Sequence, residues 1–210
     1  VANQPAMPTA EALIVQKDSP IQSIKDLKGK RVVLNKGSNV HYLLLKLLEA
    51  NNLKLDDIQV VYLPPADARA AFEKGAVDAW VIWDPFFAAA EQQIGARVIA
   101  NGENLVKNYQ FYMADRKFAE QNPEVVKAVI NELNVAADWM TKNQDEAAKI
   151  LEKPTGLDAS ILKTSIGRMN LGVQPISNQV ATQQQYVADA FYNQKLIPNK
   201  INIQAAILAK

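Results

Sequence analysis

The residues best suited to ligand chemistry lie in a short polar segment, residues 35–41, with the sequence NKGSNVH. This segment separates an apolar run from a leucine-rich stretch, so it is predicted to join a strand to a helix. Gly37 lets a ligand come close to the backbone, and Ser38 and Asn39 supply side-chain donors. The N-terminus of a helix carries unpaired N–H groups and a partial positive charge, which together favour an anion. The alternative is that Ser38 simply caps the helix.

His41 falls one turn into the same predicted helix and is the only histidine in the chain. It is expected either to donate a hydrogen bond to a bound anion or to lie on the helix surface as an ordinary residue. A lone histidine forms no catalytic constellation. The sequence has no cysteine, which excludes disulfides, thiolate catalysis and cysteine-based zinc sites. We therefore expect no catalytic residue, no metal and no cofactor.

A second group of candidates is Trp83, Asp84 and Phe86, within the segment WVIWDPFF at residues 80–87. The segment ends an apolar run and precedes helical spacing, so these residues are predicted to lie at the same sheet edge as Ser38. Aromatic rings around an acid form an apolar wall with one polar group, as ligand clefts commonly have. The alternative is that both tryptophans are core residues and Asp84 caps the following helix.

Two charged residues complete the candidate set. Asp67, in the segment PPADAR, opens a helix predicted after another strand. It either contributes to the site or is a first-turn acid favoured by the helix dipole. Arg168 carries a planar, permanently charged guanidinium that suits a sulfonate or a carboxylate; the alternative is an ordinary surface ion pair.

The elements that must position these residues follow an alternating pattern of strand and helix in the first half of the chain. Strands separated by helices of about ten residues indicate right-handed βαβ units and a mostly parallel sheet. In such sheets, ligands bind beyond the carboxyl ends of the strands. The predicted strands are 12–16, 31–35, 58–63, 77–83 and 97–100, and the predicted helices are 38–50, 66–74 and 86–94.

The pattern becomes mainly helical after residue 108. A short strand is predicted at 111–114, and Pro123 is placed at the first position of a helix, where proline is well tolerated. Further helices are predicted at 145–151, ended by Pro154, at 157–167 and at 179–193.

The composition is that of an ordinary globular protein, with 49% hydrophobic and 21% charged residues and a net charge of +1. This balance provides no broad positive field for nucleic acid or an anionic membrane, so any anion must be bound locally. No apolar run approaches the roughly 20 residues of a membrane-spanning helix. Val1 opens onto a polar stretch without a signal peptide, so the chain is expected to be mature, processed or truncated.

Several longer segments carry a family resemblance: SPI at 19–21, DLKGKRVVLNKGSNVH at 26–41, PADARAAFEKGAVDAWVIWDPF at 65–86 and FYNQKLIPNKINI at 191–203. With them, residues 10–102 resemble the aliphatic sulfonate-binding proteins of ABC importers. This family is related to the taurine, nitrate and thiamine-precursor binding proteins.

The resemblance implies an α/β fold of the type II periplasmic-binding-protein kind, with a ligand held between two lobes. Residues 14–108 would form a complete second lobe with a parallel sheet. Residues 1–13 and 109–210 would form crossover segments and the helical C-terminal part of an incomplete first lobe, because the opening βαβαβ of the family is absent. An apolar face left uncovered in this way is expected to promote self-association of the truncated chain.

The implied function is capture of a small anion, an alkanesulfonate, for import. A sulfonate is a permanent anion with three acceptor oxygens, so it needs N–H donors and neither a base nor a metal. The implied partners are ABC permease subunits in the inner membrane, with no nucleic acid involved. The implied location is the periplasm, either free or lipid-anchored outside the cytoplasmic membrane.

Two other functions share this fold class. A thiamine-pyrimidine synthase-like enzyme would need a pyridoxal-binding lysine and a suitably placed histidine, for which only His41 is available. An effector-binding domain of a bacterial transcription regulator would normally follow a helix-turn-helix, and none precedes Val1.

Overall fold

The computed structural model describes residues 1–208, which form two compact units. The α/β unit consists of Met7–Asn108 and Ala148–Met169. The helical unit consists of Val1–Ala6, Tyr109–Ala147 and the described residues from Asn170 onward.

The α/β unit is built on a five-stranded sheet with the strand order β4-β3-β5-β2-β6. Strand β3 is parallel to both β4 and β5, whereas β2 runs antiparallel to both β5 and β6. The sheet is therefore mixed: the predicted parallel pairing holds for β3, β4 and β5, whereas the reversed strand β2 makes antiparallel pairs with β5 and β6. The strands are β2 (Glu11–Val15), β3 (Arg31–Leu34), β4 (Gln59–Tyr62), β5 (Ala79–Trp83) and β6 (Arg97–Asn101).

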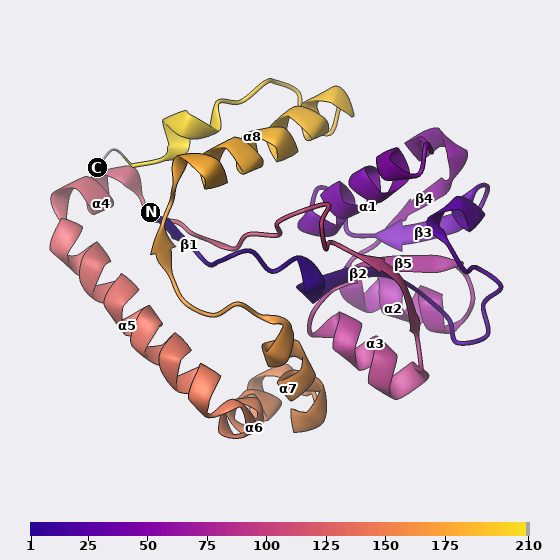
Figure 1. The fold of residues 1–210 in the computed structure, drawn as a ribbon, viewed down its shortest axis with the longest axis horizontal. Helices are drawn as coiled ribbons and strands as arrows, with labels where there is room; N and C mark the ends of the chain where they lie inside the picture. Colours follow the sequence, from indigo (N-terminus) through magenta and orange to yellow (C-terminus); the bar gives the residue numbers. More distant parts are fainter. Residues whose placement is uncertain (209–210) are drawn as a thin grey trace. The chain divides into compact units, whose positions relative to one another are not determined.

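Helices cover both faces of this sheet (Figure 1). In β2, Leu13 and Val15 pack in the core cluster that contains the leucines of α1, while Ala12 and Ile14 pack in the cluster that contains residues of α2 and α3. Alternate residues of a strand point to opposite faces, which is why all five residues of β2 are buried. The helices are α1 (Asn39–Ala50), α2 (Pro65–Glu73) and α3 (Phe86–Ile94). Short 3-10 turns are η1 (Pro8–Ala10), η2 (Ile24–Leu27) and η3 (Leu55–Asp57).

Two later helices, α6 (Gln144–Thr155) and α7 (Ala159–Arg168), contribute to the α/β unit. Ile161 of α7 packs against Ala88 and Ala89 of α3. The sequence-based division, which placed everything after residue 108 with the other lobe, differs from the structure here because α7 buries its apolar residues on α3. Helix α6 also continues through Pro154, which lies in its last turn, so the predicted end at residue 151 is wrong.

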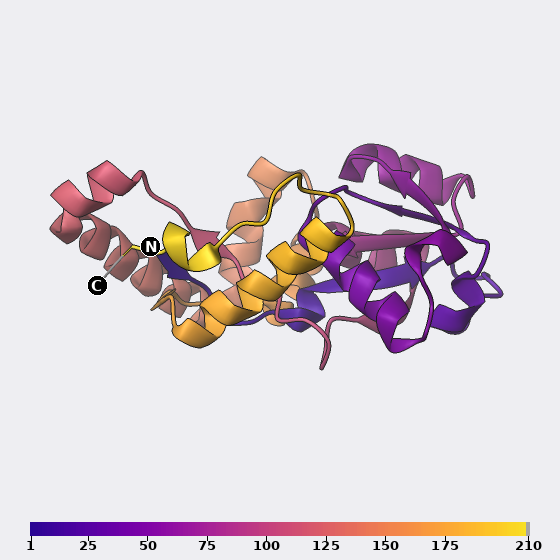
Figure 2. The same ribbon diagram turned by 90° about the horizontal axis from the view of Figure 1, so that it is seen from above.

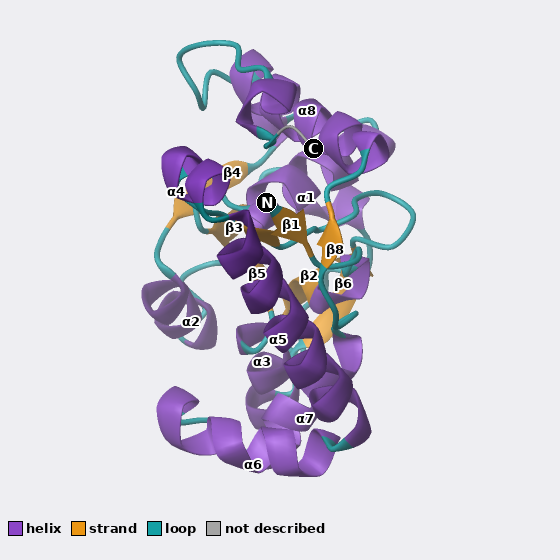
Figure 3. Ribbon diagram, turned by 90° about the vertical axis from the view of Figure 1, so that its left-hand side faces the viewer, coloured by secondary structure: helices purple, strands orange, loops and turns teal. Residues whose placement is uncertain are grey.

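The helical unit has a small three-stranded sheet in which β1 (Ala2–Asn3) pairs antiparallel with β7 (Phe111–Tyr112) and with β8 (Gln174–Pro175). Figure 3 shows β1 and β8 side by side. The side chain of Gln185 in α8 accepts a hydrogen bond from the N–H of Ile203 (2.9 Å), so the C-terminal loop runs beside this helix (Figure 2). The helices are α4 (Arg116–Gln121), α5 (Pro123–Lys142), α8 (Asn178–Asn193) and the 3-10 turn η4 (Ile203–Ala206).

Helix α5 is amphipathic but poorly covered. Pro123 is at its first turn, as predicted, and no residue of this helix, all of which the structure describes, is buried. Val125 and Val129 are 49% and 53% exposed. Within residues 1–208, no helix combines the length and the apolar character needed to cross a bilayer.

Candidate functional site

The predicted site residues at three strand ends lie along one edge of the sheet. Strands β4, β3 and β5 are parallel neighbours, so their carboxyl ends share an edge. Gly37, Ser38 and Asn39 follow β3, Asp67 follows β4, and Trp83 closes β5. The predicted placement of these residues at a common edge is confirmed.

The N-terminus of α1 is a helix end whose N–H groups are open to a ligand. Ser38 is the N-cap residue, but its hydroxyl donates to the carbonyl of Asn35 (2.7 Å) and makes no side-chain cap. Within the described part of the chain, the N–H groups of Asn39 and Val40 make no hydrogen bond, whereas those of the next two residues bond to the carbonyl of Ser38. Simple capping by Ser38 is therefore not what the structure contains.

Gly37 shapes the approach to this helix end. Its φ of +74° lies in the left-handed region, and a Cβ added to it would have no atom within 4 Å. Glycine adopts such a φ without the steric cost that a side chain brings. The turn is therefore both glycine-dependent and open on the side where a ligand would come close to the backbone.

His41 is fully buried, so the expectation that it lies on the surface is wrong, and it supports the turn from inside. Its Nδ1 accepts a hydrogen bond from the N–H of Gly37 (3.1 Å), and its ring lies 5.5 Å from that of Tyr62. Burial, with a smaller contribution from the charge of Lys36, lowers the pKa of His41 to about 4. The imidazole is thus neutral at physiological pH, and its Nδ1 holds the turn as an acceptor.

Asn39 joins the start of α1 to two other segments. Its side-chain amide donates to the Oε2 of Glu11 (2.6 Å) and to the Oδ1 of Asn108 (3.1 Å). Glu11 opens β2 opposite Trp83 and is only 1% exposed. Burial raises the pKa of Glu11 to about 8, although the bond from Asn39 acts in the opposite direction.

Glu11 and Asn108 were missed by the reasoning from sequence. A charged residue directly before the apolar run ALIV was the available signal for Glu11. No local pattern of residue types marks Asn108, whose φ of +49° becomes visible only in the structure.

The aromatic residues of β5 and of the start of α3 divide between the core and the sheet edge. Trp80 is completely buried and lies in the core with Phe72 and Phe87. Trp83 and Phe86 are only partly buried, so they present apolar surface at the edge. The alternative that both tryptophans are core residues holds for Trp80 alone.

Asp84 and Arg168 form a charged cluster that ties α7 to α3. The carboxylate of Asp84 accepts from the N–H of Ala88 (3.0 Å) and from Arg168 (3.3 Å). The guanidinium of Arg168 also pairs with Glu91 and lies 3.9 Å from the ring centroid of Phe87. Burial raises the pKa of Asp84 to about 6, while the charge of Arg168 works against this shift. Arg168 thus forms ion pairs, but one partner is the buried Asp84 and not a surface group as its alternative expected. Asp84 accepts from an N–H in the first turn of α3, although the N-cap residue of this helix is Pro85.

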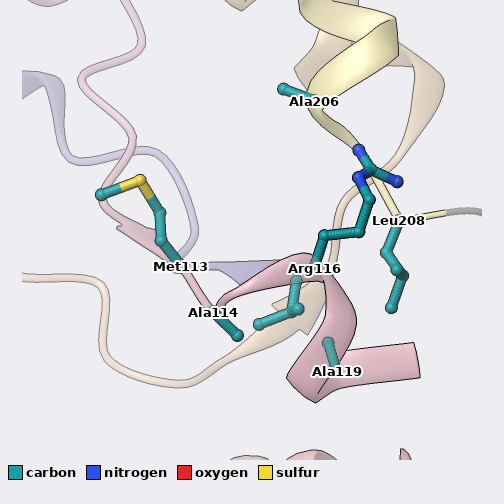
Figure 4. A pocket seen from close by; sticks show the side chains of 7 residues that line it. Met113, Ala114, Arg116, Ala119, Ala206 and Leu208 are labelled. Atoms are coloured by element: carbon teal, nitrogen blue, oxygen red, sulfur yellow. The ribbon is translucent and has the colours of Figure 1, made fainter. Parts of the chain in front are cut away.

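Asp67 is exposed in the first turn of α2, where the helix dipole favours a negative charge. In the described part of the chain, no group of three or more His, Cys, Asp or Glu side chains could hold a metal ion. A separate cavity of about 160 Å³ lies in the helical unit and involves none of the predicted site residues (Figure 4). Its lining residues are Val1, Met113, Ala114, Arg116, Ala119, Ala206 and Leu208.

Known proteins resemble this chain along nearly its whole length. The family described as NMT1/THI5 like matches residues 7–147. A curated protein of Escherichia coli strain K12, named "Putative aliphatic sulfonates-binding protein", is 41% identical over 209 residues, which cover 99% of this chain and 65% of the relative. The chain therefore spans less than two thirds of the length of that relative.

Two solved structures have the same fold. The periplasmic aliphatic sulphonate binding protein SsuA from Escherichia coli superposes with a TM-score of 0.92 at 39% identity, covering 98% of this chain and 71% of that one. The alkanesulfonate-binding protein SsuA from Xanthomonas axonopodis pv. citri, bound to MOPS, superposes with a TM-score of 0.90 at 36% identity, covering 99% and 72%. The predicted periplasmic-binding-protein fold is thus confirmed.

Proposed function

Because the chain belongs to the NMT1/THI5-like family, we propose that it is the substrate-binding part of an ABC importer that captures an alkanesulfonate. The sulfonate binds at the N-terminus of α1, through the backbone N–H groups of Asn39 and Val40. The names of the relatives, which are sulfonate-binding proteins, favour this function over a thiamine-pyrimidine synthase-like enzyme or a regulator domain.

The single observation that carries the proposal is the open helix end. The N–H groups of Asn39 and Val40 are left without acceptors inside the described chain, and Gly37 leaves the approach unobstructed. A sulfonate supplies three acceptor oxygens and a permanent negative charge, which suit N–H donors and the positive end of a helix dipole.

Neighbouring residues supply the rest of the ligand environment. Trp83 and Phe86 present apolar surface at the same sheet edge, suited to an alkyl chain. Asp67, exposed at the start of α2, disfavours a second negative charge on the ligand, since like charges repel. The site thus selects a short, singly charged, partly apolar anion.

The setting of this function is also part of the proposal. The protein acts in the periplasm, delivers its ligand to permease subunits in the inner membrane and carries out no reaction on it. Closure of two lobes around the ligand would remove water from the anion and signal occupancy to the permease.

Titration with ethanesulfonate, followed by NMR of the backbone amides, tests the proposal. The amide signals of Asn39 and Val40 are expected to shift most, since they would donate to the sulfonate. Ethyl methyl sulfone, which is neutral and of similar size, serves as the control and should leave these signals in place. Shifts confined to other regions, or equal shifts with the sulfone, would contradict an anion site at this helix end.

A further inference from the structure

We propose that Glu11 is a positioning residue for the anion site: its neutral carboxyl holds Asn39 at the start of α1, and loss of its proton weakens anion binding. This inference rests on the proposed function, because the site it concerns is the one at α1. Sequence analysis did not single out Glu11, and the proposed binding contacts do not involve it directly.

The geometry places Glu11 one side chain away from the open N–H groups. Asn39 is the first residue of α1 and its amide nitrogen has two protons, one donated to Glu11 (2.6 Å) and one to Asn108 (3.1 Å). The amide of Asn108 in turn donates to the carbonyl of Met7 (3.0 Å). Both donor positions of Asn39 are therefore occupied, which fixes its orientation.

The same contacts join α1 to the two ends of the first segment of the α/β unit. Met7 and Asn108 are the first and last residues of that segment, and the N–H of Met7 also bonds to the carbonyl of Lys107 (2.9 Å). Glu11 thus helps to set the position of the helix end relative to the strands that enter and leave the sheet.

Electrostatics decide which form of Glu11 is compatible with a bound anion. Burial raises the pKa of the carboxyl to about 8, so the neutral form dominates at pH 7. Ionised Glu11 would put a negative charge beside the proposed sulfonate, in a region shielded from water, where like charges repel more strongly than in solution. Anion binding and proton retention by Glu11 therefore favour each other.

Other ionisable groups on the surrounding elements do not reproduce this behaviour. His41 on α1 has its pKa lowered to about 4, and Asp84 after β5 has a pKa near 6 and an Arg168 partner. Both therefore have their titration midpoints below that of Glu11. Burial raises the pKa of Glu11, and the hydrogen bond from the Asn39 amide acts against this rise.

The test compares wild type with Glu11→Gln, which is isosteric, always neutral and still offers an acceptor to Asn39. Affinity for ethanesulfonate is measured between pH 6.5 and 9 by carbon-detected NMR, which tolerates fast amide exchange. Wild-type affinity is expected to be constant near pH 7 and to fall by up to about tenfold per pH unit above pH 8. The Gln variant should keep its affinity through pH 9.

Two further variants separate positioning from general effects. Glu49→Gln removes an exposed carboxylate at the far end of the same helix and should leave the wild-type pH profile unchanged. Glu11→Ala removes both the acceptor for Asn39 and the titrating group, so it should bind more weakly than wild type at pH 7 and should lack the decline in affinity above pH 8. Parallel loss of affinity above pH 8 in wild type and Glu11→Gln would overturn the role of Glu11 while leaving the proposed function intact.

A ligand-free titration keeps the two proposals distinguishable. The Glu11 carboxyl carbon should titrate with a midpoint near 8, and the side-chain carbonyl carbon of Asn39 should follow with the same midpoint. If ethanesulfonate shifts no signal of residues 37–40 at any pH, the proposed function fails. If the Asn39 signal does not follow Glu11, the positioning role fails regardless of binding.

Discussion

His41 illustrates how one buried side chain can support a binding turn without contacting the ligand. Its Nδ1 accepts from the N–H of Gly37, which requires that this nitrogen carries no proton. The ring is fully buried, and protonation would break the bond and place a charge in a dry environment. The residue is therefore a neutral structural acceptor.

This arrangement predicts acid sensitivity that originates at His41. The pKa falls from the ordinary 6.5 to about 4 in the folded protein, so the stabilisation is complete above pH 6.5 and is lost as the pH falls through 4. A shift of this size corresponds to roughly 3 kcal/mol of unfolding free energy. Asp84 and Glu11, whose pKa values are raised, act in the opposite direction, since they stabilise most at low pH.

The variant His41→Leu isolates the effect. Loss of the bond to Gly37 should cost about 1 kcal/mol at pH 7.5, but the unfolding free energy should then decrease less between pH 6.5 and 4 than in wild type. Urea denaturation at several pH values measures the unfolding free energy and its pH dependence. Contributions from the carboxylates that wild type and variant share cancel when the two proteins are compared. Identical pH dependence in both proteins would rule out His41 as the source.

At the scale of elements, the turn before α1 depends on backbone conformation rather than on packing. Gly37→Ala should destabilise the protein by about 1 kcal/mol because its φ is positive, a region that costs a side chain energy. It should also reduce sulfonate affinity, since the methyl group would occupy the open approach. Gly167→Ala is the matched control, because Gly167 lies in α7 with no atom within 4 Å of an added Cβ.

The two substitutions are expected to have opposite signs. Alanine in place of a helical glycine stabilises by roughly 0.5–1 kcal/mol, so Gly167→Ala should raise the melting temperature while Gly37→Ala lowers it. Thermal unfolding and ethanesulfonate titration of both variants provide the measurements. A stabilising effect of Gly37→Ala would contradict the proposed turn conformation.

The attachment of α7 to α3 depends on Arg168. Replacing it by Met would leave the buried carboxylate of Asp84 without its cation. Removing one partner of a buried ion pair typically lowers the unfolding free energy by about 3 kcal/mol. Hydrogen exchange should accelerate in the amides of α7 first, because α7 would lose its charged link to α3. The control Arg116→Met removes a half-exposed arginine whose ion pair with Glu120 spans 3.9 Å and should cost less than about 1 kcal/mol.

At the scale of the whole molecule, the chain is expected to bind sulfonate weakly. One exposed helix N-terminus contributes about 0.3–1 kcal/mol for an anion, whereas micromolar affinity requires about 8 kcal/mol. The chain spans 65% of the length of its relative from Escherichia coli, and a periplasmic binding protein gains affinity by enclosing its ligand. Calorimetry of the 210-residue chain with short alkanesulfonates should detect binding no tighter than the millimolar range, and micromolar binding by a monomer would contradict this expectation.

We expect copies of the chain to associate through the exposed apolar surface of α5. Its exposed valines, Val125 and Val129, belong to an apolar stripe that each copy could bury against another, gaining up to about 1.5–3 kcal/mol per fully buried side chain. The double variant Val125→Glu/Val129→Lys preserves the helix through a favourable pair at i and i+4. It should weaken self-association at least about tenfold in sedimentation equilibrium, whereas Lys127→Ala on the same helix should not.

The succession of strands and helices in the α/β unit, and the edge where its candidate residues lie, could be predicted from residue patterns alone. The short apolar runs of β2 and β5 and the leucine spacing in α1 reflect local geometry, in which side chains repeat every two residues in strands and every 3.6 in helices. Gly37 before a leucine-rich helix predicted an open helix start for the same local reason. Such features can be inferred from neighbours in the chain.

The partners of the polar residues at this edge depend on contacts between distant parts of the chain. Glu11 meets Asn39 across 28 positions, and Arg168 meets Asp84 across 84. These contacts depend on the reversed direction of β2 and on α7 returning to pack on α3. Burial then sets the protonation of Glu11 and His41. Local residue patterns do not encode strand order or long-range packing, so the charge states of the site emerge only when the chain is folded.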